Sequence, residues 1–250
     1  MADFQIVLVD HYSDWSNLRP LTLTRPVSHL RVGILRIFEK WEHFFKQKVQ
    51  VKSCVDYLQS MSNFSPNTQE AFCYINSTIL PTPELCGAIQ NLKAGDSLYA
   101  DGILLASMVN PTEGHFENEV YFDEEIIRID KPWTIFQQNE KAIELDFTQI
   151  TKGRKSQTLD TEANLIVGKE SLQRIFVEEG AEVNGAILSP KNGYIYVGKN
   201  AEIMEGAVVR GSLAMCEGAV LKLAAKIYGA TTIGPYSKVG GEVNNSVIQG

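Results

Sequence analysis

The sequence lacks several features that would assign it to common functional classes. No segment approaches the roughly 20 consecutive apolar residues that a membrane-spanning helix needs. The acidic first residues do not form a signal peptide, and no five basic residues stand together. With a formal net charge of -7, this argues against nucleic-acid and membrane-surface partners. We therefore expect a cytoplasmic protein.

Cysteine and histidine are also scarce. The four cysteines are scattered and include no C-x-x-C pair, so we expect buried or free thiols in a reducing compartment. The four histidines have neither the spacing of metal ligands nor a matching nucleophile motif, and none follows His115. The sequence thus contains neither a disulfide framework nor a recognisable histidine-based metal site.

A six-residue repeat is present near the C-terminal end of the sequence. Its aliphatic positions are Val197, Ile203, Val209, Met215, Leu221, Ile227, Ile233 and Val239, and a mostly small residue stands four places after each. Neither the helical nor the strand period gives this spacing, whereas each face of the triangular coil of a left-handed parallel β-helix takes about one hexapeptide. We therefore predict such a β-helix over residues 163–250, with the aliphatic side chains pointing inward.

The repeat continues to the last residue of the sequence. A solenoid needs an atypical capping coil, because a bare terminal coil exposes its core and its strand edges. No such coil is visible before Gly250. We therefore expect that the natural C-terminus lies beyond residue 250.

The first 130 residues show a different pattern, in which strands and helices alternate. Residues 4–10 form an apolar run suited to a strand buried on both faces, and apolar side chains at helical spacing predict a helix over residues 30–45. Such alternation predicts a mainly parallel, Rossmann-like α/β domain. The chain is long enough for two domains, and residues 131–162 are interpreted as a helical connector and linker between them.

Residues 18–26, Leu-Arg-Pro-Leu-Thr-Leu-Thr-Arg-Pro, carry the clearest chemical pattern of this first domain. They follow the first predicted strand, and a doubly wound sheet binds ligands at the carboxyl ends of its strands. The guanidinium groups of Arg19 and Arg25 suit a triphosphate or a sugar phosphate, because arginine grips phosphate oxygens bidentately. A surface loop whose arginines pair with Asp14 or with glutamates explains the composition equally well.

The same segment resembles the signature of sugar-phosphate nucleotidyltransferases, in which a glycine-rich loop leads into Arg, then Pro-Leu-Thr, then Arg-Pro-Lys. Joined to a β-helix, it is similar to the bifunctional N-acetylglucosamine-1-phosphate uridyltransferase/glucosamine-1-phosphate acetyltransferase family, in particular to a variant bacterial branch. The resemblance implies a nucleotidyltransferase-type domain over residues 1–130. Its substrates would be a nucleoside triphosphate and a sugar 1-phosphate, joined with release of pyrophosphate, as in the synthesis of UDP-N-acetylglucosamine for the cell envelope. It also implies Mg²⁺ and a homotrimer.

The resemblance also implies roles for individual residues. Arg19 and Arg25 would be catalytic, by neutralising charge that develops on the phosphates. Substrate would be bound by Asp10, Arg19, Thr22, Arg25, Asn76 and Asp101. Asn76 aligns with the strand-end magnesium ligand of the family, and Asp101 is a second candidate metal ligand, for which a plain strand-end turn is the alternative.

The sequence departs from the family pattern at three places. Residues 10–17 contain no glycine where the family has its phosphate-binding loop, Val27 stands in place of the lysine, and Asn76 in place of an aspartate. A catalytically degenerate sugar-nucleotide-binding, regulatory or scaffold module is therefore the alternative function. Asn139 weakly resembles a second metal-side asparagine, and a helix-surface position is the alternative.

The β-helix raises the possibility of acyl transfer. Related acyltransferases use a histidine base to deprotonate the amine that attacks acetyl-CoA. Because no histidine follows His115, we expect acetyl-CoA to serve only a longer, full-length protein, with the base beyond residue 250.

Overall fold

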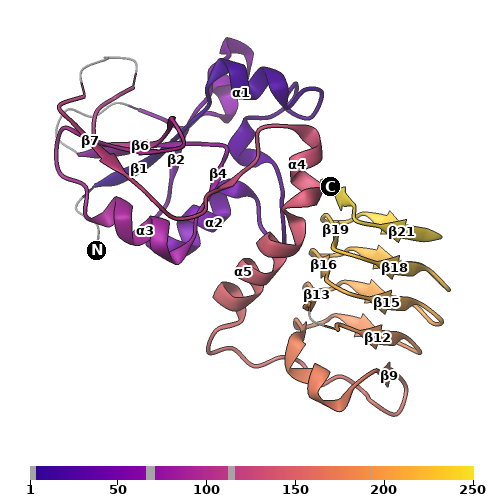
Figure 1. Ribbon diagram of the computed structural model, residues 1–250. Helices are drawn as coiled ribbons and strands as arrows, with labels where there is room; N and C mark the ends of the chain where they lie inside the picture. Colours follow the sequence, from indigo (N-terminus) through magenta and orange to yellow (C-terminus); the bar gives the residue numbers. More distant parts are fainter. Residues whose placement is uncertain (1–3, 66–70, 112–115, 192) are drawn as a thin grey trace. The chain divides into compact units, whose positions relative to one another are not determined.

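The computed structural model describes residues 4–65, 71–111, 116–191 and 193–250. The chain forms two compact units (Figure 1). Unit 1 comprises Met1–Leu30 and Arg36–Thr134, and unit 2 comprises Arg31–Leu35 and Ile135–Gly250. A short segment from the N-terminal part of the sequence thus belongs to the unit that holds the C-terminal repeat. The domain limits 1–130, 131–162 and 163–250 stay predictions.

Unit 1 is built on a six-stranded sheet with the strand order β2-β1-β3-β6-β5-β7. The strands are β1 (Gln5–Val9), β2 (Gln50–Lys52), β3 (Phe72–Asn76), β5 (Asp96–Ala100), β6 (Ile103–Ser107) and β7 (Asn118–Tyr121), and β4 (Ile79–Leu80) pairs separately with β8 (Ile127–Arg128). β1 runs parallel to β2 and β3. The residues that follow these strands, Asp10, Ser53 and Ser77, therefore lie at one edge of the sheet.

The strand predicted over residues 4–10 is confirmed, because β1 lies inside the sheet and Ile6, Val7 and Leu8 are fully buried. The sheet is mainly parallel, as predicted, because β1, β2, β3, β5 and β7 run in one direction and β6 is the antiparallel strand between β3 and β5. Asp101 and Gly102 join β5 to β6 with φ angles of 50° and 74°. Positive φ at both positions is typical of a type I′ hairpin turn, for which Asp-Gly is a preferred pair.

The helices α1 (Tyr12–Asn17), α2 (Ile37–Phe45) and α3 (Pro83–Gln90) also belong to unit 1. The prediction of a helix over residues 30–45 is wrong in its first half, because α2 begins only at Ile37. The backbone N–H of Arg36 donates to Oε2 of Glu39 at 2.7 Å, a capping-box interaction that fixes the start of the helix. Upstream, Gly33 has a φ of 76°, which a right-handed helix does not allow.

Unit 2 contains three sheets of short strands that form the faces of a parallel β-helix (Figure 1). The first consists of β10 (Ile175–Val177), β13 (Ile195–Val197), β16 (Leu213–Met215), β19 (Thr231–Ile233) and β22 (Val247–Ile248), and the second of β11 (Glu182–Val183), β14 (Glu202–Ile203), β17 (Val220–Leu221) and β20 (Lys238–Val239). The third consists of β9 (Leu165–Ile166), β12 (Ile187–Ser189), β15 (Val208–Arg210), β18 (Lys226–Tyr228) and β21 (Glu242–Asn244). Their pairings are parallel.

The coil length matches the sequence repeat. Ile195 pairs with Leu213, which pairs with Thr231, so one coil takes 18 residues and each face takes six. Every aliphatic position of the repeat is buried, with Val239 the most exposed at 8%. The predicted fold class, an α/β domain followed by a parallel β-helix, is therefore confirmed.

Helices α4 (Pro132–Gln137) and α5 (Asn139–Thr151) lie between the sheet of unit 1 and the β-helix in sequence. Within unit 2, α5 packs Ile143, Phe147 and Ile150 into an apolar cluster with Phe176 and Ala214 of the coils. The connector therefore covers part of the β-helix surface. In the part of the chain that the structure describes, no helix combines the length and the apolar character needed to cross a membrane.

The segment Arg31–Leu35 is held in unit 2 by a buried polar network. Oδ1 of Asn139 accepts the N–H of Gly33 at 2.8 Å, and Oδ2 of Asp146 accepts the N–H of Ile34 at 2.8 Å. The Thr232 hydroxyl donates to the carbonyl of Gly33 at 3.0 Å. Asn139 is fully buried, so its expected helix-surface position is wrong.

We expect Gly33→Ala to destabilise unit 2 strongly. A Cβ at this position would lie 2.6 Å from Oδ2 of Asp146 and 2.8 Å from the backbone carbonyl of Ala142, and the positive φ adds strain of about 1–3 kcal/mol. Gly153→Ala is the matched control, because φ is 73° there and a Cβ would meet no atom within 4 Å. Urea unfolding followed by hydrogen exchange should show the larger loss for Gly33→Ala, and equal losses would contradict the steric argument.

Candidate functional site

A hollow lies at the edge of the unit 1 sheet where β1 and β2 end. Its volume is about 330 Å³, and it is lined by Val9, Asp10, His11, Tyr12, Lys52, Ser53, Cys54 and Pro111. The carboxyl ends of parallel strands are the usual ligand-binding edge of an α/β sheet. We therefore take this hollow and the loop that follows β1 as the candidate site.

Asp10 is the most unusual group of the site. It is 4% exposed, and only its Oδ2 accepts a hydrogen bond, from the N–H of Val27 at 3.1 Å. Burial raises the pKa of this carboxyl from its ordinary 3.8 to about 6, and the neighbouring Ser77 hydroxyl and the backbone N–H groups of Val27 and Ser28 offset part of the rise. Within the described residues, Oδ1 of Asp10 and the hydroxyls of Ser28 and Ser77 are buried without a partner. Three polar groups at this edge thus have unused hydrogen-bonding capacity.

The loop after α1 is fixed by two reciprocal hydrogen bonds. The indole Nε1 of Trp15 donates to the carbonyl of Thr22 at 2.9 Å, and the Thr22 hydroxyl donates to the carbonyl of Trp15 at 2.7 Å. Thr22 is fully buried. Its role in substrate binding stays a prediction. In the structure, the Thr22 side chain stabilises the loop through its hydrogen bond to Trp15.

The two arginines of the loop keep their charge unneutralised. The exposed Arg19 donates to the carbonyl of Ser16 at 3.1 Å and to its hydroxyl at 2.7 Å, and its guanidinium lies 5.5 Å from the ring centre of Trp15. Arg25 is half-buried and has no salt bridge among the described residues. The alternative in which these arginines pair with Asp14 does not apply, because that carboxylate binds another residue.

The partner of Asp14 is Arg128, which the sequence did not reveal as a site residue. Its Nη2 lies 2.7 Å from Oδ1 of the nearly buried Asp14, and its Nε is 3.4 Å from the Thr78 hydroxyl. Asp14 and Arg128 are separated by 114 positions in the sequence. An ion pair over such a separation leaves no local pattern to recognise.

The two candidate metal ligands are not brought together. Oδ1 of Asn76 accepts both the N–H and the hydroxyl of Thr78, at 3.0 and 2.8 Å, so its lone pairs are occupied. Asp101 lies in a separate hollow with Asp123, Glu124 and Glu125. Across the residues that the structure describes, no three His, Cys, Asp or Glu side chains have the arrangement of a metal site. These residues do not fit a preformed Mg²⁺ site, and magnesium binding by Asn76 and Asp101 stays a prediction.

Aromatic side chains beside the hollow were not identified from the sequence. Tyr12 and Tyr57 are 64% and 59% exposed, and their ring centres lie 5.5 and 6.5 Å from that of Trp15. An exposed tyrosine that lines a hollow, as Tyr12 does, offers a flat surface for a nucleobase or a sugar ring. The available signal was the position of Tyr12, two residues after the strand predicted over residues 4–10.

These observations define an α/β domain that carries a buried carboxylate and a cationic loop at its ligand-binding edge, and that is followed by a parallel β-helix. Residues 6–155 match the family model described as sugar nucleotidyl transferase. The match covers more than half of the chain, so the chain belongs to the sugar nucleotidyl transferase family. No match was found among curated proteins. The bifunctional uridyltransferase/acetyltransferase branch stays a prediction.

The family match extends beyond unit 1. It ends at residue 155, after α5, and therefore includes both Arg31–Leu35 and the helix that binds this segment. Both belong to unit 2. The region typical of the family thus contributes its last helix to the unit that contains the β-helix.

His115 lies outside the described residues.

Proposed function

We propose that the protein is a sugar-1-phosphate nucleotidyltransferase. A phosphate oxygen of the sugar 1-phosphate attacks the α-phosphorus of a nucleoside triphosphate, the bond from that phosphorus to the bridging oxygen breaks, and pyrophosphate leaves with both electrons. The observation that carries the proposal is the unneutralised pair Arg19 and Arg25 on the loop after β1, in a chain of this family. Fixed positive charge stabilises the charge that develops on the phosphates.

Asp10 and the hydroxyls of Ser28 and Ser77 would serve to hold the substrate. A buried carboxylate oxygen without a partner accepts a hydrogen bond from a ligand hydroxyl, such as those of ribose or of a sugar. The exposed rings of Tyr12 and Tyr57 would contact a base or a sugar face. Because Asn76 and Asp101 do not fit a magnesium site, no step of the proposal depends on a protein-bound ion.

A second candidate is a sugar-nucleotide-binding module without catalysis. The specific observation in its favour is that the residues in place of the glycine-rich loop fold as the helix α1, with Asp14 paired to Arg128 and not available to a ligand. An assay for pyrophosphate release separates the two candidates, with a set of nucleoside triphosphates and sugar 1-phosphates and added magnesium. Binding without pyrophosphate release would support the module, and release would support the enzyme.

Alanine at Arg19 or Arg25 is expected to weaken triphosphate binding by about 1.5–3 kcal/mol, the range for a charge-assisted contact. Stability should change little, because Arg19 is exposed and neither arginine forms a salt bridge with a described residue. Calorimetric titration with uridine and thymidine triphosphates checks this. Lys93→Ala is the control, since it removes one positive charge from an exposed position elsewhere in unit 1. Equal losses in all three variants would contradict a specific role for the loop.

Finer features of the function are also proposals. We propose UDP-N-acetylglucosamine as the product class, in cell-envelope precursor synthesis, and acetyl-CoA as a substrate of a longer protein only. We further propose a homotrimer, because closed cyclic assemblies are the expected form for stacked β-helices. Light scattering of the purified chain tests the assembly, and a monomer would contradict it.

A further inference from the structure

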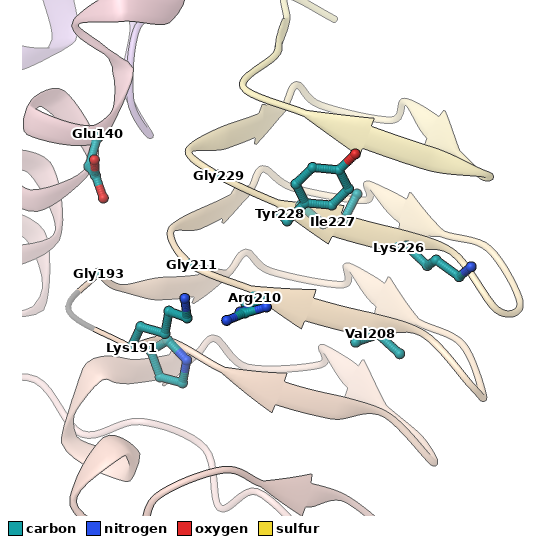
Figure 2. A pocket seen from close by; sticks show the side chains of 11 residues that line it. Glu140, Lys191, Gly193, Val208, Arg210, Gly211, Lys226, Ile227, Tyr228 and Gly229 are labelled. Carbon is teal, nitrogen blue, oxygen red and sulfur yellow. The ribbon is translucent and has the colours of Figure 1, made fainter.

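A larger hollow lies on the β-helix, within unit 2. Its volume is about 860 Å³, which exceeds that of the hollow beside Asp10 and falls in the range of small-molecule sites. The lining residues include Glu140 of α5, Lys191 of the turn after β12, and five residues of β15 and β18 (Figure 2). The family resemblance and the proposed reaction use none of these residues.

The register of the third sheet determines which side chains form the floor. Val209 and Ile227 point into the β-helix and are buried, so their neighbours in each strand point outward. Arg210 pairs with Tyr228 and Val208 pairs with Lys226 across adjacent coils. Neighbouring strands are about 4.8 Å apart. The side chains of Arg210 and Tyr228 are therefore attached at adjacent positions on the same face of the sheet.

The charge of the hollow is mostly positive although the chain as a whole is acidic. Lys191, Arg210 and Lys226 form no salt bridge with any described residue, and Glu140 is the single acidic side chain among the described lining residues. Figure 2 shows Lys191 and Arg210 on the same side of the hollow. Unpaired cations that line one concave surface create a local positive potential that attracts anions.

Tyr228 supplies a fixed flat surface beside these cations. It is 38% exposed, and its hydroxyl donates to Oε1 of Glu242 at 2.6 Å, which holds the ring in place. The corner residues Gly211 and Gly229 carry no side chains that would fill the space next to it. A ring packed on an exposed tyrosine, next to phosphates held by arginine and lysine, is a recurrent way to bind nucleotides.

We propose that this hollow is a second ligand site, which takes a nucleoside diphosphate, either free or within a nucleotide sugar. Arg210 and Lys191 bind the phosphates, and the base packs against Tyr228. Val208 and Lys226 line the remaining floor. The proposal concerns unit 2 and does not depend on the reaction proposed for unit 1.

The test uses the full chain with Arg19→Ala and Arg25→Ala in place, so that binding at the unit 1 loop is weakened. UDP and ADP are titrated calorimetrically, with UDP-glucose to distinguish a free diphosphate from a nucleotide sugar, and inorganic phosphate to measure the anion alone. Hydrogen exchange of β15 and β18 locates the ligand. We expect binding of at least one diphosphate, with increased protection in these two strands.

Further variants identify the contacts. Arg210→Ala should weaken diphosphate binding about 10-fold or more, and Tyr228→Ala several-fold, whereas Tyr228→Phe keeps the ring and should lose less affinity than Tyr228→Ala. Lys238→Ala, which removes an exposed charge from the second sheet, is the control. The proposal is overturned if no diphosphate binds at millimolar concentration, or if Arg210→Ala and Lys238→Ala lose affinity equally. If Arg19→Ala and Arg25→Ala abolish triphosphate binding, this result tests the function proposed for unit 1. It neither supports nor contradicts the second site in unit 2.

Discussion

Leu221→Ala is expected to lower the free energy of unfolding of the β-helix by about 2–5 kcal/mol, the range for removing a large aliphatic side chain from a packed core. Leu221 lies in β17 and is fully buried in the cluster that runs through all three faces. The surrounding coils are fixed by backbone ladders on each face, so the cavity cannot close easily. Hydrogen exchange of the coil amides measures the loss.

Leu223→Ala is the matched control for this experiment. Leu223 is two residues further along the same coil and is 64% exposed, so its truncation removes similar atoms without opening a cavity. We expect a change within about 0.5 kcal/mol. Tryptophan fluorescence should not follow either change, because Trp15, Trp41 and Trp133 all belong to unit 1. Similar losses in the two variants would contradict the packed core.

The β-helix could be predicted from the sequence because its period is local. Ile203 and Val209 occupy equivalent positions on successive faces, and each is buried by residues one coil away. The insertion of Arg31–Leu35 into unit 2 could not be predicted in this way. Gly33 bonds to Asn139 106 positions later, and Arg31 bonds to Gln249 218 positions later. Helical spacing in this segment suggested a helix, and Gly33 was the one local sign against it.

For the candidate site, the sequence indicated the place of the loop after the first strand. It did not indicate the hydrogen bonds that individual side chains form. The loop with Arg19 and Arg25 follows β1 at the ligand-binding edge, as expected from strand order. Thr22 and Asn76 use their side chains for local hydrogen bonds instead. For Asn76 a signal existed, because asparagine readily bonds to the backbone two residues on. For Asp101, the alternative to a metal ligand was a strand-end turn, and the Asp-Gly sequence indicated such a turn.

Asp10→Asn is expected to stabilise unit 1 at neutral pH by about 3 kcal/mol. The pKa of Asp10 is raised from 3.8 to about 6 in the folded protein, mainly by burial, and a shift of about two pH units corresponds to this energy. Well below pH 3.8 the carboxyl is protonated in both the folded and the unfolded chain. As the pH rises from about 4 to 6, Asp10 loses its proton in the unfolded chain before it does so in the folded chain. The free energy of unfolding of the wild type therefore falls over this range and stays at the lower value above pH 6. Asparagine has no charge to bury, so the variant escapes this loss.

Urea unfolding followed by tryptophan fluorescence between pH 4 and 8 measures the difference, since the tryptophans report on unit 1. The stability difference between the variant and the wild type should be small at pH 4 and reach its full size above pH 6. Asp123→Asn, which removes an exposed carboxylate of the same unit, is the control, and a pH-independent effect of Asp10→Asn would contradict the argument. A carboxylate that costs stability at neutral pH and has a free buried oxygen is better explained by ligand binding than by folding. We therefore expect the more stable variant to bind its nucleotide or sugar phosphate more weakly.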